Sequence, residues 1–298
     1  MERREFLKQS ALTAAAAATA KLSAATTSTN PIARRPLGKT GEHLSIIGFG
    51  GIVVMNEEVS NSNNIVVEAV DRGVNYFDVA PSYGNAQERL GQALAPYRKN
   101  CFFTCKTKGR MKDDSRKQLE ESPRLLKTDH VDLYQFHGVT KMTDLDKVLG
   151  PGGAMETMEA AKQEGKIRHI GFSVHSAETA LAAMDRYNAD SEACAGKGMD
   201  ILAPKAMAKT VWSDDQEQSN PEPKCWYQPA AFPDEASLGL RWTLGHPVTA
   251  ALPPGDERYF RLAMDVAQNY KPLERNEEQT LLARTIGVEP IFRLGNDV

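Results

Sequence analysis

Residues 76–94 read YFDVAPSYGNAQERLGQAL, and this stretch decides the fold. It opens as an apolar run typical of a buried strand, and Asp78 stands at the end of that run. A turn-rich segment with Tyr83 follows, and then a helical pattern with Leu90 and Leu94 on one face. The stretch therefore predicts a strand, a loop and a helix, with an acid at the carboxyl end of the strand, where β/α folds build active sites.

This stretch resembles the signature of the aldo-keto reductase family. In that signature an Asp and a Tyr stand five residues apart, before a helix that carries Glu and a Leu-Gly pair. The corresponding residues here are Asp78, Tyr83, Glu88, Leu90 and Gly91. Without the resemblance, the better interpretation would be that Asp78 caps a turn and that Tyr83 covers a surface. The resemblance implies NAD(P)H-dependent interconversion of a carbonyl and an alcohol.

Length and composition agree with that fold. The chain has 298 residues, of which 41% are hydrophobic and 25% charged, which is typical of a globular protein. We expect the α/β class, with one (β/α)8 TIM barrel in residues 33–298. A net charge of −3 gives no electrostatic case for binding nucleic acid. No stretch reaches the 18 or so apolar residues of a membrane-spanning helix.

The first 30 residues read as an export signal rather than as part of the fold. The segment ERREFLKQ at positions 2–9 carries paired Arg3 and Arg4, and an alanine-rich run and a small-residue tail follow. The paired arginines resemble a twin-arginine signal, with cleavage after Ala20 or Ala25. A disordered basic tail or an amphipathic helix is the alternative. The signal predicts contact with the twin-arginine export machinery and a periplasmic location, or retention at the membrane if uncleaved.

Two further strand ends carry candidate catalytic residues. Lys106 ends a strand predicted at 101–106, where a lone ammonium is costly unless Asp78 offsets it. Lys108 is the alternative on the same strand face, and His137 follows a strand predicted at 131–136. Singly, these would be a surface lysine and a packed histidine. The resemblance implies that Asp78 and Lys106 lower the pKa of Tyr83, the general acid, and that neutral His137 binds the substrate carbonyl.

The candidate cofactor site begins at Gly50 and Gly51, which end a strand predicted at 44–49 and permit close approach of a ligand. A simple tight turn is the alternative. By resemblance, Ser173 at the end of the strand predicted at 166–173 meets the nicotinamide carboxamide, although Val174 stands where the family often has Asn. Lys205 closely follows the strand predicted at 199–203, where the resemblance resumes, and is also predicted to bind the cofactor.

A phosphate site is suggested by LPPGDERYF at 252–260, which opens a predicted helix. Gly255 precedes the helix, and Arg258 or Arg261 could meet a 2′-phosphate. The acidic residues at 256 and 257 suit the helix dipole but would repel that phosphate. Both NADP(H) and NAD(H) therefore remain open, and no metal site is indicated.

The remaining elements follow from local patterns. Residues 142–153 are expected to form a loop, and residues 209–232 a long irregular excursion that could cover the substrate. Pro123 indicates a kink or an early end in a helix predicted at 113–127. Further helices are predicted at 59–73, 155–164, 177–187 and 233–244, a strand at 248–252, and a closing helix and tail at 276–298.

The pattern breaks near residue 188. About 11 residues, 188–198, separate two predicted elements, whereas a crossover with its helix needs roughly 10–12 residues by itself. By resemblance, strand six and the start of helix six are missing, so we expect an incomplete barrel with an unpaired strand edge. A truncated gene model or a decayed paralogue would both explain the gap.

Three functions remain open on the sequence. The first is reduction of a small-molecule carbonyl or sugar substrate, which the intact set of four polar residues favours. The second is a degenerate, non-catalytic barrel that binds a ligand or partner, which the missing strand favours. The third is a periplasmic sugar-binding or sugar-oxidising protein that retains its cofactor through export.

Overall fold

The computed structural model describes residues 30–188, 200–218 and 223–292. The chain divides into two units, Met1–Asn30 and Pro31–Val298, and the fold is that of the second. The predicted export signal lies outside the described residues, apart from Asn30. The predicted gap near residue 188 lies almost entirely outside them as well.

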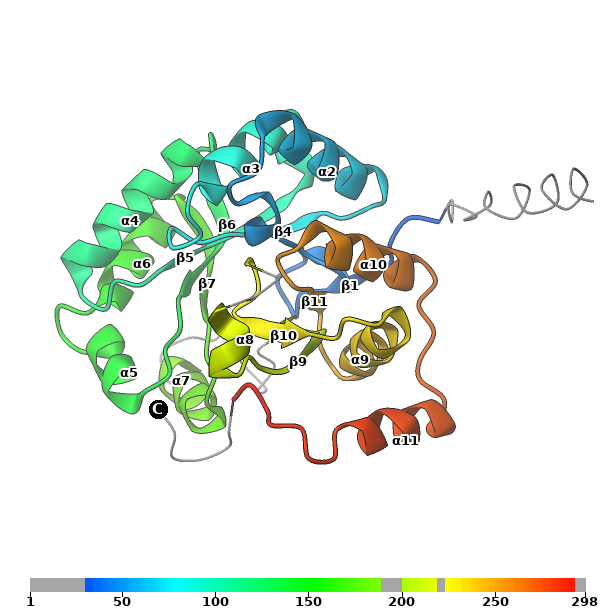
Figure 1. Ribbon diagram of the computed structural model, residues 1–298. Coiled ribbons are helices and arrows are strands. Elements are labelled where there is room, and N and C mark those ends of the chain that lie inside the picture. The colour runs from blue at the N-terminus through cyan, green and yellow to red at the C-terminus, as the bar shows by residue number, and fades with distance from the viewer. Residues whose placement is uncertain (1–29, 189–199, 219–222, 293–298) are drawn as a thin grey trace, which may run out of the picture. The chain divides into compact units, whose positions relative to one another are not determined.

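A five-stranded parallel sheet forms the centre of the fold, in the order β3-β4-β5-β6-β7 (Figure 1). Its strands are β3 (Phe49–Gly50), β4 (Tyr76–Asp78), β5 (Phe102–Thr107), β6 (Val131–Phe136) and β7 (Ile167–Phe172). Every residue of β4 and β5 is buried. The near-continuous apolar runs in the sequence therefore reflect strands covered on both faces.

A second parallel pair extends this sheet. β8 (Leu202–Pro204) pairs with β11 (Ala250–Leu252), and a parallel bridge between Ile47 and Ala251 joins β11 to the chain just before β3. Within the described residues, no ladder joins β7 to β8. The predicted α/β class with a parallel sheet is confirmed. The missing sixth strand stays a prediction, since residues 189–199 are not described.

Helices cover the outer side of the sheet, whereas the short α8 (Asp214–Gln218) lies near the centre of the view (Figure 1). The other helices are α2 (Val59–Asp71), α3 (Ala86–Leu94), α4 (Lys112–Leu125), α5 (Met142–Leu149), α6 (Ala154–Gln163), α7 (Ala177–Asn188), α9 (Pro233–Gly245), α10 (Glu257–Gln268) and α11 (Arg275–Arg284), with 3-10 turns η1 (Gly51–Val54) and η2 (Ala95–Asn100). No helix in the described part of the chain has the length and apolarity needed to cross a membrane.

Two hydrophobic clusters separate the faces of the sheet. Phe77, Phe103 and Tyr134 belong to the large cluster shared with the helices. Their immediate neighbours Tyr76, Phe102 and Leu133 belong to a smaller cluster, with Leu37, Leu44, Ala250 and Leu252. This alternation is the two-residue period of a strand, so the smaller cluster marks the inner side of the sheet.

Three predictions about secondary structure, for one strand and two irregular segments, are wrong. The predicted strand 44–49 is split, because β2 (His43–Ser45) pairs antiparallel with β1 (Arg34–Pro36) and the chain then turns into β3. The predicted loop 142–153 contains α5, whose Leu145 and Val148 lie three residues apart and are buried. The predicted irregular excursion contains α8 and a hairpin of β9 (Ala208–Val211) and β10 (Tyr227–Pro229).

Pro123 lies inside α4 and does not end the helix at once. The helix continues for two residues and ends at Leu125, with the amide of Leu126 still donating to the carbonyl of Ser122. Proline has no backbone N–H to donate, and Pro123 lies in the last turn of α4, so few hydrogen bonds of the helix follow it.

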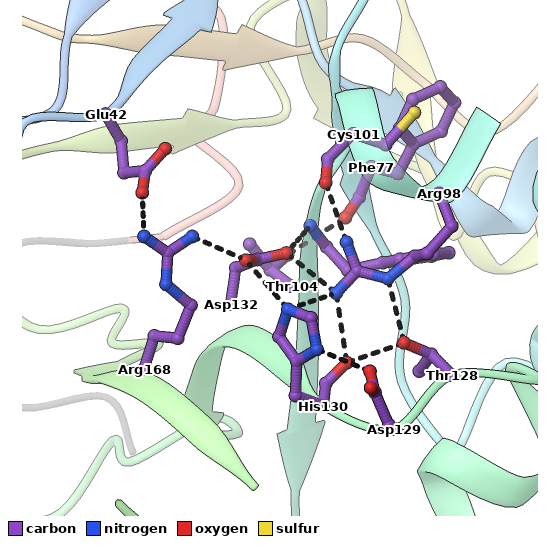
Figure 2. Close-up of polar contacts among 11 residues, drawn as sticks. Glu42, Phe77, Arg98, Cys101, Thr104, Thr128, Asp129, His130, Asp132 and Arg168 are labelled. Atoms are coloured by element: carbon purple, nitrogen blue, oxygen red, sulfur yellow. Dashed lines mark hydrogen bonds and ion pairs between the residues drawn. The ribbon is translucent and has the colours of Figure 1, made fainter. Parts of the chain in front are cut away.

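A buried carboxylate ties the amino ends of the strands together (Figure 2). One oxygen of Asp132 accepts from the amide of Phe103 at 2.8 Å and pairs with Arg98 at 3.1 Å, while the other accepts from Arg168 at 2.9 Å. Arg168 also pairs with Glu42, just before β2. The network therefore links β5, β6 and β7 at the end of the sheet opposite to the strands' carboxyl ends.

Asp132→Ala should destabilise the protein by roughly 3 kcal/mol, because it removes the carboxylate that pairs with Arg98 and Arg168 and leaves the buried amide of Phe103 without that acceptor. Urea unfolding followed by circular dichroism measures the loss. Asp129→Ala is the matched control, since that side chain is 92% exposed and pairs with His130 at the surface, and it should cost less than about 1 kcal/mol. Equal losses in the two variants would contradict the assignment.

Candidate active site

The alternation of side chains carries four polar residues to one place. Asp78 shares the inner face with Tyr76, two residues earlier, and Lys106 lies four residues after inner-facing Phe102. His137 lies four residues after inner-facing Leu133 and follows β6 directly. Because neighbouring parallel strands end at the same edge, these side chains converge at the carboxyl end of the sheet.

Lys106 and Asp78 form a buried ion pair. The ammonium donates to one oxygen of Asp78 and, at 3.3 Å, to the carbonyl of Val79, while Thr104 donates to the other oxygen at 2.7 Å. Burial alone would lower the pKa of Lys106, but the Asp78 carboxylate and the Tyr83 oxygen outweigh it and raise that pKa. The structure thus places Lys106 against Asp78, whereas Lys108 is exposed.

Tyr83 lies in the loop after β4 and is half-buried beside this pair. The Lys106 ammonium is 5.4 Å from the centre of the Tyr83 ring, and the His137 ring meets it edge-on at 5.8 Å. Burial raises the pKa of Tyr83, and Asp78 adds to the rise, while Lys106 opposes it. The lowering implied by the resemblance is therefore outweighed, and Tyr83 carries its proton at neutral pH.

His137 is held by its backbone and has a free ring nitrogen. The amide of His137 donates to the carbonyl of Thr107 at 2.8 Å, and the side chain of Arg110 donates to the carbonyl of His137 at 2.9 Å. Within the described residues, the buried Nδ1 has no hydrogen-bond partner. Burial, together with Lys106 and other nearby cations, lowers the pKa of His137 to about 3. The imidazole is neutral and can bind a further polar group.

The residues predicted for the nicotinamide end differ in their surroundings. A Cβ added at Gly50 would meet no atom within 4 Å, so the end of β3 is open. At Gly51 it would lie 2.8 Å from the side chain of Val79, so this glycine is required by packing of η1 on β4. Ser173 follows β7, and its backbone bonds to Phe136 and Val139. By strand parity Ser173 lies on the same inner face as His137.

The residues predicted to bind the phosphates of the cofactor make contacts within the chain itself. A Cβ at Gly255 would lie 2.4 Å from Ile52, so the absence of a side chain there serves packing of η1 on the start of α10. Arg258 is exposed and donates to Asp256 at 2.9 Å. Arg261 donates to Glu68 on α2 at 2.8 Å and pairs with Glu257. Both arginines thus bind carboxylates of the chain itself.

Lys205 lies apart from those residues, in a left-handed turn after β8 with φ of 65°. Its ammonium is 5.7 Å from the ring centre of Trp226 and 5.2 Å from that of Phe292. Burial, with the charge of Lys106, lowers its pKa to about 8. The ring of His175 stacks on Phe292 at 4.2 Å. His175, Lys205 and Phe292 line a cavity of about 370 Å³ between the ends of β7 and β8.

Sequence reasoning missed His175 and Phe292 as residues of this cavity. His175 follows Ser173 by two residues, and Trp226, beside Lys205, falls in the excursion that the sequence predicts to cover the substrate. Nothing in the local pattern around Phe292 marks it, because its neighbours come from the segments after β7, after β8 and before β10 rather than from the adjacent chain. The carbonyl of Glu289, which accepts from Thr210 at 2.8 Å, helps to hold this C-terminal segment in place.

The neutral state of His137 predicts a stability that falls with acid. Below about pH 6.5 an unfolded histidine binds a proton, whereas folded His137 does not until about pH 3, so stability is lost as the pH falls through this window. Between pH 7 and pH 5, the free energy of unfolding should fall by about 1 kcal/mol less in His137→Asn than in the parent chain, after allowance for solvent screening. Urea midpoints at the two pH values test this, and identical pH slopes for both proteins would contradict it.

Curated relatives match mainly the first half of the fold. An uncharacterized oxidoreductase of Bacillus subtilis is 31% identical over 154 residues, 47% of this chain and 48% of the relative. L-galactose dehydrogenase of Arabidopsis thaliana is 30% identical over 158 residues, 47% of each chain. The chain thus spans about half the length of these two relatives. D-galacturonate reductase of Fragaria ananassa is 23% identical over 284 residues, 82% of this chain and 88% of the relative.

Solved structures extend the likeness of the fold. The holo form of an aldo-keto reductase from Bacillus halodurans superposes with a TM-score of 0.63 at 20% identity, covering 85% of this chain and 96% of that one. The model of the Aldo/keto reductase family matches residues 47–206, more than half of the sequence, and this range includes all four residues at the carboxyl end of the sheet. The chain therefore belongs to the aldo/keto reductase family.

Proposed function

We propose that this protein reduces an aldehyde or ketone with a nicotinamide dinucleotide, and that Tyr83 donates the proton. The observation that carries the proposal is the convergence of Tyr83, His137 and the buried Lys106–Asp78 pair at one end of the sheet. Membership of the family and the oxidoreductase names of the relatives support the reaction class.

Each residue has a distinct part in this reaction. The reduced nicotinamide, when bound, supplies a hydride to the carbonyl carbon. Tyr83, which keeps its proton at neutral pH, gives that proton to the carbonyl oxygen as charge develops there. Neutral His137 positions that oxygen by a hydrogen bond. Lys106 stays charged and stabilises the tyrosinate that remains, and Asp78 holds Lys106 in place.

The surroundings of the site have room for a nicotinamide ring but are unfavourable for the additional 2′-phosphate of NADP(H). The open end of β3 at Gly50 leaves room for a flat ring, and Ser173 lies across the inner face at the end of β7. At the phosphate end, Arg258 and Arg261 are bound to carboxylates, and Asp256 lies at the start of α10. This charge pattern supports NAD(H) over NADP(H), since carboxylates repel the additional phosphate.

The names of two relatives support a sugar as the carbonyl substrate. L-galactose dehydrogenase and D-galacturonate reductase both act on sugars or sugar acids by name. The open β7–β8 edge within the described residues favours a second candidate, a barrel that binds such a ligand without turnover. The two candidates differ in one observable, oxidation of the reduced dinucleotide in the presence of an aldehyde.

Tyr83→Phe should lower kcat for aldehyde reduction by about a thousandfold, because the proton donor is lost while the ring stays in place. The absorbance of the reduced nicotinamide follows the reaction. Tyr97→Phe is the matched control, since Tyr97 lies on η2 at the outer side of the fold, and it should keep full activity. A parent chain that binds dinucleotide but reduces no aldehyde would favour the non-catalytic candidate.

We also propose that residues 1–30 direct export to the periplasm through the twin-arginine route, with the barrel occupying residues 33–298. The proposal rests on the RR-x-F-L-K core and the alanine-rich run behind it. A cofactor-binding protein suits this route, because it transports folded proteins.

Replacing Arg3 and Arg4 together by lysine should abolish export, because the machinery reads the arginine pair rather than positive charge. Fractionation of bacteria that express the full chain measures the periplasmic share. Replacing Lys8 by arginine is the control and should leave export intact. Equal periplasmic amounts of the double-lysine variant and the parent would contradict the proposal.

A further inference from the structure

The cavity between the ends of β7 and β8 adjoins the four converging residues. Its lining comes from the segment after β7, which includes His175, from Lys205 after β8, and from Phe292 of the C-terminal segment. The charge of Lys205 helps to lower the pKa of His137, so the cavity lies within electrostatic reach of the four residues. A ligand whose reacting carbonyl lies at Tyr83 and His137 can therefore extend into this cavity.

Lys205 has no carboxylate of its own in the described part of the chain, unlike Lys106, which Asp78 neutralises. Its ammonium lies instead among aromatic rings, with Trp226 and Phe292 within 6 Å. A half-buried ammonium without an anionic partner is costly. Its backbone adopts a left-handed conformation that a non-glycine residue rarely takes, a form of strain that concentrates at functional sites.

We propose that the substrate is an anionic carbonyl compound whose carboxylate binds Lys205 in this cavity. The inference rests on the proposed reductase function and adds the class of substrate. The rings of His175 and Phe292 line the cavity and supply walls for the carbon skeleton between the carboxylate and the carbonyl. The phosphates of a dinucleotide are the other source of anionic oxygens for Lys205, and the experiment separates the two.

The test compares 4-carboxybenzaldehyde with its neutral methyl ester, which share a ring and an aldehyde. The parent chain should show a higher kcat/KM for the acid. Lys205→Met should lower the acid-to-ester ratio at least tenfold, since a charge-assisted bond is lost, and Lys205→Arg should retain most of the ratio. Lys209→Met is the control, because Lys209 pairs with Glu235 on α9, and it should leave the ratio unchanged.

Two kinetic outcomes would overturn the inference. One is a parent chain without preference for the acid. The other is a Lys205→Met variant with an unchanged ratio and a raised KM for the dinucleotide, which would assign Lys205 to the phosphates of the cofactor.

A binding measurement separates this inference from the reductase function. If neither aldehyde is reduced, the proposed function fails, and 4-carboxybenzyl alcohol is titrated against tryptophan fluorescence, since Trp226 adjoins Lys205. Saturable binding that Lys205→Met abolishes, with benzyl alcohol as the neutral comparison, would support an anion site in a non-catalytic barrel. No difference between the two alcohols would overturn it.

Discussion

The buried pair of Lys106 and Asp78 is the interaction on which the site depends. Lys106 is only 5% exposed. A buried ammonium at the end of an apolar strand would be strongly unfavourable alone, and the carboxylate from the neighbouring strand makes it possible. The same pair fixes the charges around Tyr83, since one partner opposes and the other adds to the rise of its pKa. Stability of the sheet and chemistry of the site thus rest on one contact.

Framework and site are separated along the same strands. At the amino ends, Asp132 binds Arg98, Arg168 and the amide of Phe103, and these contacts hold β5, β6 and β7 in register (Figure 2). At the carboxyl ends, the inner-facing positions carry the polar residues. A parallel sheet permits this division because all its strands end at one edge, so one end can be used for rigidity and the other for chemistry.

The ionisable groups of the site divide into neutral and charged ones by their surroundings. His137 and His175 are uncharged because burial lowers their pKa values to about 3 and about 4. Lys106 is charged because Asp78 is adjacent. Lys205 lacks such a partner among the described residues, which makes it the cation best suited to an external anion. Neutral His137, protonated Tyr83 and Lys205 are the groups on which the proposal of an anionic carbonyl substrate rests.

The sequence by itself determined the central parallel strands and most helices, because the periods of strands and helices are local properties. It indicated the four converging residues through the family resemblance, which the local spacing of Asp78 and Tyr83 carries. Only the tertiary structure decided which lysine faces Asp78, that Arg258 and Arg261 bind carboxylates, and that Gly51 and Gly255 serve packing. It alone brought Phe292 to Lys205. These contacts join residues far apart in the chain, and no local pattern encodes which distant side chain fills a given space.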